Sequence, residues 1–126
     1  KRVKNLKKRI IHWDAASRSK RRKAVQDFLT DYWYHHVTFE EFPVVGTRLS
    51  LDFYNANKRV AVEVQGAQHT KYNKFFHGGH INNYFEQLKR DQIKADFCKI
   101  NDIILVEIYD SDKINKSLFK KFDVSL

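Results

Sequence analysis

The sequence predicts a single α/β (α+β) domain in which helices flank a mixed β-sheet. Its 126 residues suit one domain. Hydrophobic residues make up 42% and aromatic residues 14%, which is enough to fill a core and argues against disorder. Segments with helical and strand periodicity also alternate along the chain. We therefore expect the order helix, strands, helix, strand, helix.

The first helix is predicted from a cap and an apolar stripe. Ser17 or Ser19 can cap a helix that runs to about Trp33. Apolar side chains recur along it at helical spacing: Ala24, Val25, Phe28, Leu29 and Tyr32. An extended stretch follows, interrupted by Pro43 and Gly46.

A β-hairpin is predicted next, from residues 49–54 and 59–65 joined by the turn-forming residues 55–57. Strand alternation places Leu49, Leu51 and Phe53 on one face, and Ser50, Asp52 and Tyr54 on the other. In the second strand it groups Val60, Val62 and Val64 against Ala61, Glu63 and Gln65. The carboxylates of Asp52 and Glu63 can therefore converge across the two strands, where they would suit Mg²⁺. The alternative is that both side chains simply face solvent.

The second half of the chain is predicted to hold a loop, a helix, a strand and a short helix. The loop spans residues 66–81 and is long enough to suggest a functional role. A helix over residues 82–101 precedes a β-prone run at 103–109, which we expect to be a buried strand. Residues 112–122 are expected to form the last helix.

Asp91 is expected to lie at the centre of an inward-facing stripe of the helix 82–101. The stripe contains Tyr84, Leu88, Asp91, Ala95 and Cys98, whereas Arg90, Ile93, Phe97 and Ile100 lie on the opposite side. The first or the last helix is expected to pack on that opposite side. Because an isolated buried charge is costly, Asp91 should meet a histidine, a basic residue or a metal. His69 is the nearest candidate along the chain.

Basic residues are concentrated at the N-terminus. Residues 1–24 contain eleven basic residues and one acidic residue, whereas residues 25–126 contain thirteen basic and fourteen acidic residues. We interpret residues 1–24 as a basic arm that leads into the first helix and residues 25–126 as the catalytic domain. The pattern favours binding of a polyanion over a merely solvated tail. The candidate contacts are Lys7, Lys8, Arg9, Arg18, Lys20, Arg21, Arg22, Lys23, Lys71, Lys74 and Lys94.

Composition excludes several classes of protein. No apolar run approaches the length of a membrane span, and the basic N-terminus lacks the apolar stretch of a secretory signal. Cys98 is the only cysteine, so neither an intramolecular disulfide nor a cysteine-rich zinc site can form. We therefore expect a cytoplasmic protein that is not secreted. The sequence contains no methionine, and we expect it to be a fragment of a longer protein.

Four segments carry a resemblance to a known family: Asp52-Phe53, residues 60–69, residues 91–94 and residues 101–108. Together they resemble the very-short-patch-repair-type branch of the PD-(D/E)XK nuclease superfamily, and in particular its E-D-x-H-D homing-endonuclease relatives. The resemblance covers about residues 38–110. Its most specific part is the order of features along the chain: first a strand, then the motif Glu-x-x-Gly-x-x-His, then an Asp on a helix, and last another strand.

This resemblance implies a restriction-endonuclease-like fold and a Mg²⁺-dependent DNA endonuclease, in which Mn²⁺ can substitute, from a homing or mobile-element enzyme. Asp52 would be the central metal ligand, and Glu63 the second ligand or the group that positions water. His69 would be the base or a phosphate contact, and Asp91 would orient it. Gln65 stands where the wider superfamily places a lysine, and it could hold the attacking water.

One residue of the pattern is missing, because the helix 17–33 contains no glutamate. Asp27 is the substitute we expect. The implied partner is DNA rather than a membrane, with a second copy of the chain or a further DNA-binding domain as additional partners. Three other functions stay open: a structure-specific repair nickase or Holliday-junction resolvase of the same fold, a non-catalytic nucleic-acid-binding module, and a ribonuclease.

Overall fold

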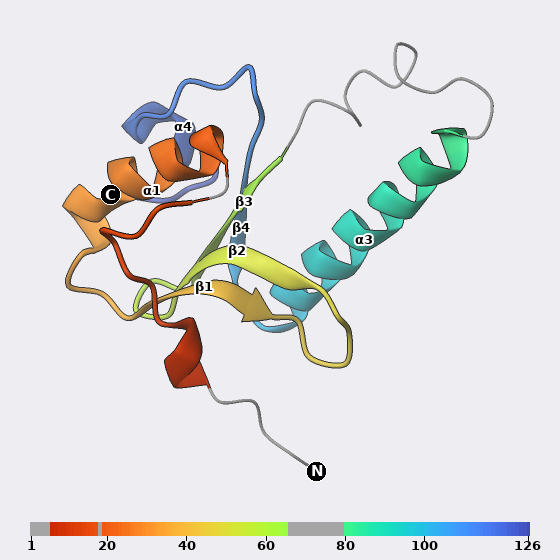
Figure 1. Cartoon of the computed structure of the whole chain (residues 1–126), viewed down its shortest axis with the longest axis horizontal. Coiled ribbons are helices and arrows are strands. Elements are labelled where there is room, and N and C mark those ends of the chain that lie inside the picture. Colours follow the sequence, from red (N-terminus) through yellow and green to blue (C-terminus); the bar gives the residue numbers. More distant parts are fainter. Residues whose placement is uncertain (1–5, 18, 66–79) are drawn as a thin grey trace.

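A computed structural model describes residues 6–17, 19–65 and 80–126 and contains one four-stranded sheet (Figure 1). The sheet order is β1-β2-β3-β4, with antiparallel pairing up to β3 and a parallel pair between β3 and β4. The predicted mixed sheet flanked by helices is therefore confirmed. The elements are η1 (Leu6–Arg9), α1 (Lys20–Trp33), β1 (Thr38–Pro43), β2 (Ser50–Asn55), β3 (Val60–Val64), α3 (His80–Ile100), β4 (Ile104–Ile108) and α4 (Lys116–Lys120).

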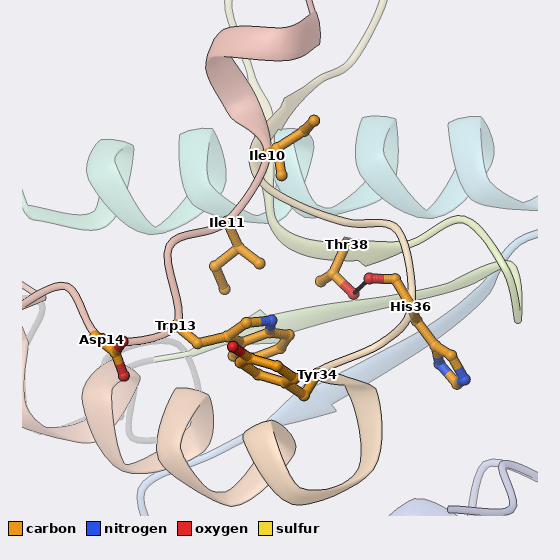
Figure 2. A pocket seen from close by; sticks show the side chains of 7 residues that line it. All are labelled: Ile10, Ile11, Trp13, Asp14, Tyr34, His36 and Thr38. Carbon is orange, nitrogen blue, oxygen red and sulfur yellow. Dashed lines mark hydrogen bonds between the residues drawn. The ribbon is translucent and has the colours of Figure 1, made fainter.

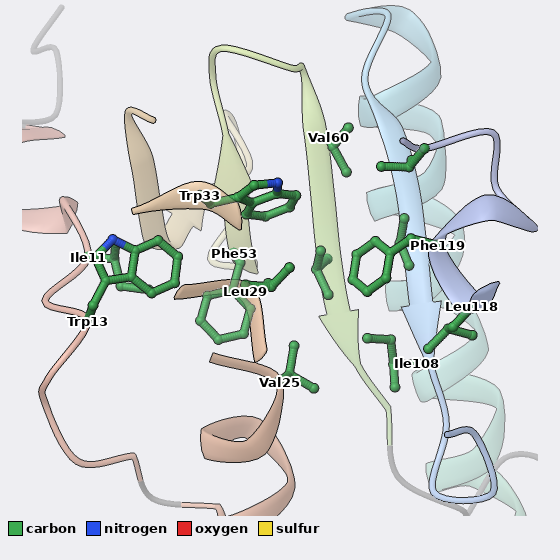
Figure 3. Close-up of a cluster of buried hydrophobic side chains, with 13 residues drawn as sticks. Ile11, Trp13, Val25, Leu29, Trp33, Phe53, Val60, Ile108, Leu118 and Phe119 are labelled. Carbon is green, nitrogen blue, oxygen red and sulfur yellow. The ribbon is translucent and has the colours of Figure 1, made fainter. Parts of the chain in front are cut away.

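The helices form two layers, one on each side of the sheet. Helices α1 and α4 lie together on one face, and α3 lies on the opposite face, as Figure 1 shows. Two apolar clusters correspond to these layers. Figure 3 shows the larger one, to which the helices contribute Val25, Leu29, Trp33, Leu118 and Phe119 and the sheet contributes Phe53, Val60, Val62, Val106 and Ile108. The smaller cluster joins Leu51, Tyr54 and Ala61 to Cys98, Ile93 and Phe97 of α3.

Helix α1 begins and ends where its sequence signals predict. The hydroxyl of Ser19 accepts a hydrogen bond from the backbone N–H of Arg22 at 3.1 Å, which caps the first turn. Val25, Leu29 and Trp33 are completely buried against the sheet. This packing fixes the rotation of α1, so that Arg22 in its first turn is held over the strands.

The stretch around Pro43, expected only to be extended, forms the edge strand β1. It pairs with β2 at every residue except Glu41 and ends at Pro43, which cannot donate to a further ladder bond. On its other side, a bridge between Ile10 and Phe39 and a hydrogen bond from the Ile11 N–H to the Thr38 carbonyl (3.0 Å) add the N-terminal segment to its edge. The basic arm is thereby attached to the sheet.

The prediction that Leu51 and Phe53 share one face is wrong. Leu51 packs beneath α3 together with Tyr54, whereas Phe53 packs beneath α1. The cause lies in the neighbouring strand, where Glu41 has a φ of 52°, in the left-handed region. Glu40 and Phe42 pair in register with β2, but no pair forms at Glu41. The alternation of both strands is therefore interrupted where Glu41 lies beside Asp52.

The predicted helix α3 is present, but the prediction of which of its side chains face the sheet is partly wrong. The helix begins at His80, inside the expected loop, whose other residues 66–79 lie outside the described part of the chain. Ile93 and Phe97, expected on the far side, pack with Cys98 against the sheet, and Leu88 is 40% exposed. Neither α1 nor α4 packs on α3, because both cover the other face. Strand β4 is not fully buried, because Ile104 is 39% exposed.

Strand β3 follows its predicted alternation. Val60, Val62 and Val64 face the cluster beneath α1, and Ala61 faces the cluster beneath α3. The hairpin that β3 forms with β2 is also confirmed. Among the described helices, none is both long enough and apolar enough to cross a membrane.

Candidate active site at the open end of the β2–β3 hairpin

Strands β2 and β3 separate at Asp52 and Glu63, which we call the open end of the hairpin. Their pairing runs from Asn55↔Val60 to Phe53↔Val62 and stops there. Beyond it, the Glu63 Oε2 accepts a hydrogen bond from the Asp52 N–H at 2.6 Å, and the Asp52 Oδ2 accepts one from the Val64 N–H at 2.8 Å. Two carboxylates therefore take the place of the backbone ladder, and the structure brings Asp52 and Glu63 together.

Each helix layer supplies one cation to this pair. From α3, the Lys94 Nζ lies 2.6 Å from the Glu63 Oε1. From α1, the Arg22 Nη1 lies 3.3 Å from the Asp52 Oδ1, and its Nη2 donates to the Asp52 carbonyl at 3.2 Å. The guanidinium also lies over the ring of Phe53, 5.1 Å from its centroid. Both basic side chains are mostly buried, with exposed fractions of 17%.

Glu41 is a third carboxylate at this end of the sheet, and no sequence pattern pointed to it. It forms an ion pair with Arg22 and accepts a hydrogen bond from the Ser50 hydroxyl at 2.7 Å. A left-handed backbone at a residue with a Cβ costs about 1–2 kcal/mol. Arg59, Asp102 and Asp123 also have positive φ values, and Glu41 is the one that lies beside Asp52 in the sheet.

Burial and repulsion raise the pKa values of the two hairpin carboxylates. Burial raises the pKa of Glu63 to about 7, and the charge of Asp52 adds to this, while Lys94 opposes it. Burial also raises the pKa of Asp52, against the opposing effects of the Val64 N–H and Arg22. Burial lowers the pKa of Arg22, but its hydrogen bond to Glu41 and the charge of Asp52 outweigh this, and the pKa is raised. The negative charge at the open end is therefore incompletely compensated.

This donor set fits a magnesium ion that keeps part of its water shell. Mg²⁺ binds in proteins through one or two carboxylates together with water and phosphate oxygens. Asp52 and Glu63 provide two adjacent carboxylates, and burial raises the pKa of both despite the nearby Arg22 and Lys94. Within residues 6–17, 19–65 and 80–126, however, no group of three or more His, Cys, Asp or Glu side chains is arranged to hold a metal.

In this site the cation beside Glu63 comes from Lys94 of α3, and Gln65 occupies the position after β3 where a related site would have a lysine. The Gln65 side chain is 8% exposed, and its Nε2 donates to the Glu107 Oε2 at 3.2 Å. Glu107 lies in register beside Glu63 on the neighbouring strand β4. The amide is therefore held towards β4, and the cation beside Glu63 comes from α3.

Asp91 and Asp27 lie apart from these contacts. The Asp91 Oδ1 accepts a hydrogen bond from Gln87 at 2.9 Å, and no ion pair joins it to another described residue. His69, its expected partner, lies outside the described residues. Asp27 is 60% exposed and pairs with Lys23 at 3.1 Å, so the expected substitute for the missing glutamate does not join the site. Glu41 is the additional carboxylate that does.

Some of the candidate nucleic-acid contacts are exposed, some are bonded to acidic side chains or carbonyls, and three lie outside the described residues. Lys7, Lys8, Arg9 and Lys20 are exposed. Four others are bonded within the protein: Arg22 and Lys94 at the open end, Lys23 to Asp27 and the Ala15 carbonyl, and Arg21 to the carbonyls of Tyr109 and Asp112. Arg18, Lys71 and Lys74 lie outside the described residues. Lys7, Lys8 and Arg9 lie in η1, directly before the bridge that joins the N-terminal segment to β1, and Lys20 is the first residue of α1.

Comparison with known proteins gives two viral relatives of unknown function. The chain is 33% identical over 66 residues to the uncharacterized protein 033L of Invertebrate iridescent virus 3, covering 52% of this chain and 34% of that protein. It is 36% identical over 66 residues to the uncharacterized protein 094L of Frog virus 3 (isolate Goorha), covering 52% and 43%. The chain thus spans less than half the length of these curated relatives. No family model and no solved structure matches the chain.

Proposed function

We propose that this chain is a divalent-metal-dependent DNA endonuclease domain with a restriction-endonuclease-like fold. The observation that carries the proposal is the open end of the β2–β3 hairpin, where Asp52 and Glu63 replace the backbone ladder. Purely solvent-facing carboxylates would have ordinary pKa values, whereas burial raises the pKa of both of these. Burying two like charges is costly, and a cationic ligand would offset that cost.

The residues of the site have distinct roles in this proposal. Asp52 and Glu63 hold the metal, which when bound polarises a phosphodiester oxygen and lowers the pKa of a bound water. Lys94 holds an ammonium beside Glu63, where it stabilises negative charge that develops on the phosphate. Arg22 fixes the position of Asp52 through its carbonyl and its carboxylate. Gln65 positions water, and His69 accepts a proton or contacts the phosphate.

The charge distribution supports DNA as the substrate. The exposed cations of η1 and the start of α1 lie on the segment that adds to the edge of β1, the strand that carries Glu41. Such cations neutralise phosphates and fix the register of a duplex without reading its sequence. They supply affinity, and the carboxylates supply the chemistry.

A cleavage assay with matched variants tests the proposal. Supercoiled plasmid, linear duplex, four-way junction and RNA are incubated with the protein and Mg²⁺, Mn²⁺ or EDTA. We expect metal-dependent cleavage of duplex DNA that falls at least about a hundredfold in Asp52→Asn and Glu63→Gln, because several kcal/mol of charge stabilisation are lost. DNA affinity should persist in both variants.

Asp27→Asn and Glu86→Gln are the controls, because both side chains are exposed carboxylates on the flanking helices. They should cleave like the wild type. Selective cutting of the junction would replace the proposal with a resolvase, and selective cutting of RNA with a ribonuclease. DNA binding without cleavage under either metal would leave a binding module and overturn the proposal.

A further inference from the structure

A second site lies where the N-terminal segment crosses the end of α1 and the start of β1. It is a pocket of about 340 Å³, within the size range of small-ligand sites. Figure 2 shows its walls, to which the N-terminal segment contributes Ile11, Trp13 and Asp14, and the α1–β1 connection contributes Tyr34, His36 and Thr38. None of these residues takes part in the open end of the hairpin.

The pocket combines two aromatic rings with an acidic acceptor. Trp13 is 9% exposed and forms part of the core, so its indole is a buried floor of the pocket with little free ring surface. Tyr34 is 58% exposed and stands at the C-cap of α1. Asp14 is exposed, and no described residue donates to its carboxylate. Exposed aromatic rings are platforms on which nucleobases stack.

The N-terminal segment is held rigidly enough to form a site. The Gln26 side chain, 4% exposed, donates to the carbonyls of Trp13 (2.9 Å) and Ala15 (3.2 Å). The Ile11 N–H donates to the Thr38 carbonyl at 3.0 Å. A buried amide and a strand-like bond therefore fix the Trp13 ring before any ligand arrives, which lowers the entropic cost of binding.

The basic residues that precede the pocket in the chain, which are not among its lining residues, favour an anionic ligand. Ile10, 44% exposed at the edge of the pocket, directly follows Arg9, and Lys8 and Arg9 are exposed basic residues of η1. A ligand that matches this surface carries an aromatic ring for the pocket and a phosphate for the rim. A nucleotide has both groups.

The position of the pocket relates it to the carboxylates. Thr38 and Glu41 lie three residues apart on β1, so about 10 Å separates the two sites along the strand. This distance corresponds to about three base steps of 3.4 Å. One DNA strand can therefore reach both sites.

We propose that this pocket binds an unpaired base of the DNA strand held at the open end of the hairpin, and that Asp14 favours bases with an exocyclic amine. The exposed Tyr34 ring stacks on the base face, with the Trp13 indole beneath it, and the Asp14 carboxylate accepts a hydrogen bond from the amine, as Asp and Glu do with cytosine N4. The inference rests on the proposed function for its substrate. It adds a subsite that selects the sequence or structure near the cut.

Tryptophan fluorescence in EDTA tests binding without cleavage. Trp13 and Trp33 are the two tryptophans of the sequence, and Trp33→Phe therefore leaves the Trp13 indole alone. If that variant does not fold, the wild type is used instead, because the completely buried Trp33 contributes a constant background. Single-stranded homopolymers of dC and dT and an abasic strand of equal length are titrated. We expect the base-containing strands to quench Trp13, with dC binding more tightly than dT, and the abasic strand to leave the emission unchanged.

Three variants separate stacking from general charge. Tyr34→Ala should weaken binding about fivefold to a hundredfold, as loss of one stacked base does. Asp14→Asn should remove the preference for dC. Phe85→Ala, an equally exposed aromatic on α3, should change nothing. Equal quenching by the abasic strand, or unchanged affinity in Tyr34→Ala, would overturn the inference even if the protein cleaves DNA. Quenching without any cleavage would overturn only the proposed function.

Discussion

The two ends of the β2–β3 hairpin are built from the same strands but held together in different ways. At the closed end, beside the turn of residues 56–59, backbone pairs Asn55↔Val60 and Phe53↔Val62 join the strands, and their side chains fill two apolar cores. At the open end, carboxylates take the backbone donors and helix cations surround them. The closed end carries stability, whereas the open end buries charge at a cost that suggests a ligand.

Truncation of the closed end should give the largest change in stability. Phe53 is completely buried in the cluster beneath α1. Phe53→Ala should therefore lower the free energy of unfolding by about 3–5 kcal/mol. Asp52→Asn, one residue away, should change it by less than about 1 kcal/mol, because the amide oxygen can still accept from Val64 and a buried charge is removed. Urea unfolding measures both, and a larger loss in Asp52→Asn would contradict the contrast.

Removal of the Lys94 ammonium should lower the stability of the folded protein. Lys94→Gln leaves Glu63 buried without its cation, and we expect a loss of about 2 kcal/mol above neutral pH, the size of a hydrogen bond to a charged group. In a Glu63→Gln background, Lys94→Gln should lower the free energy of unfolding much less. Lys89→Gln, at an exposed position of α3, is the control. Equal costs in the two backgrounds, by a double-mutant cycle, would show that the pair is not coupled.

The pH dependence of stability should report Glu63 directly. Because burial raises its folded-state pKa to about 7 from an ordinary 4.5, the folded protein keeps a proton that the unfolded chain loses in that window. The contribution of this side chain is complete below about pH 4.5 and falls as the pH rises towards 7. The wild type should therefore lose stability relative to Glu63→Gln between these values. Parallel melting curves across this range would contradict the burial of an ionisable Glu63.

The sequence predicted the elements whose signals are local. The apolar stripe and a cap at Ser17 or Ser19 predicted α1, which begins after Ser19 and ends at Trp33, and the alternation of β3 placed Glu63 correctly because β3 is regular. The order of elements in turn indicated the mixed sheet.

Features that depend on distant contacts could not be predicted. The left-handed backbone at Glu41 has no local signal, because glutamate is not a residue that favours it, and it changed the faces assigned to Leu51 and Tyr54. Arg22 and Lys94 looked like surface cations for DNA, and only helix packing turned them towards the carboxylates. The predicted orientation of α3 was partly wrong because the inward stripe was centred on Asp91, whereas Ile93 and Phe97 pack against the sheet with Cys98.

Calorimetric titration with Mn²⁺ in the absence of DNA tests the central claim most directly. At about pH 8, above the raised pKa of Glu63, the Glu63 carboxylate is ionised and we expect one Mn²⁺ to bind per chain, with Mg²⁺ competing. Binding should be lost in Asp52→Asn and Glu63→Gln and retained in Asp27→Asn. Folded wild-type protein that binds no Mn²⁺, or that binds it equally well without Asp52, would contradict the account.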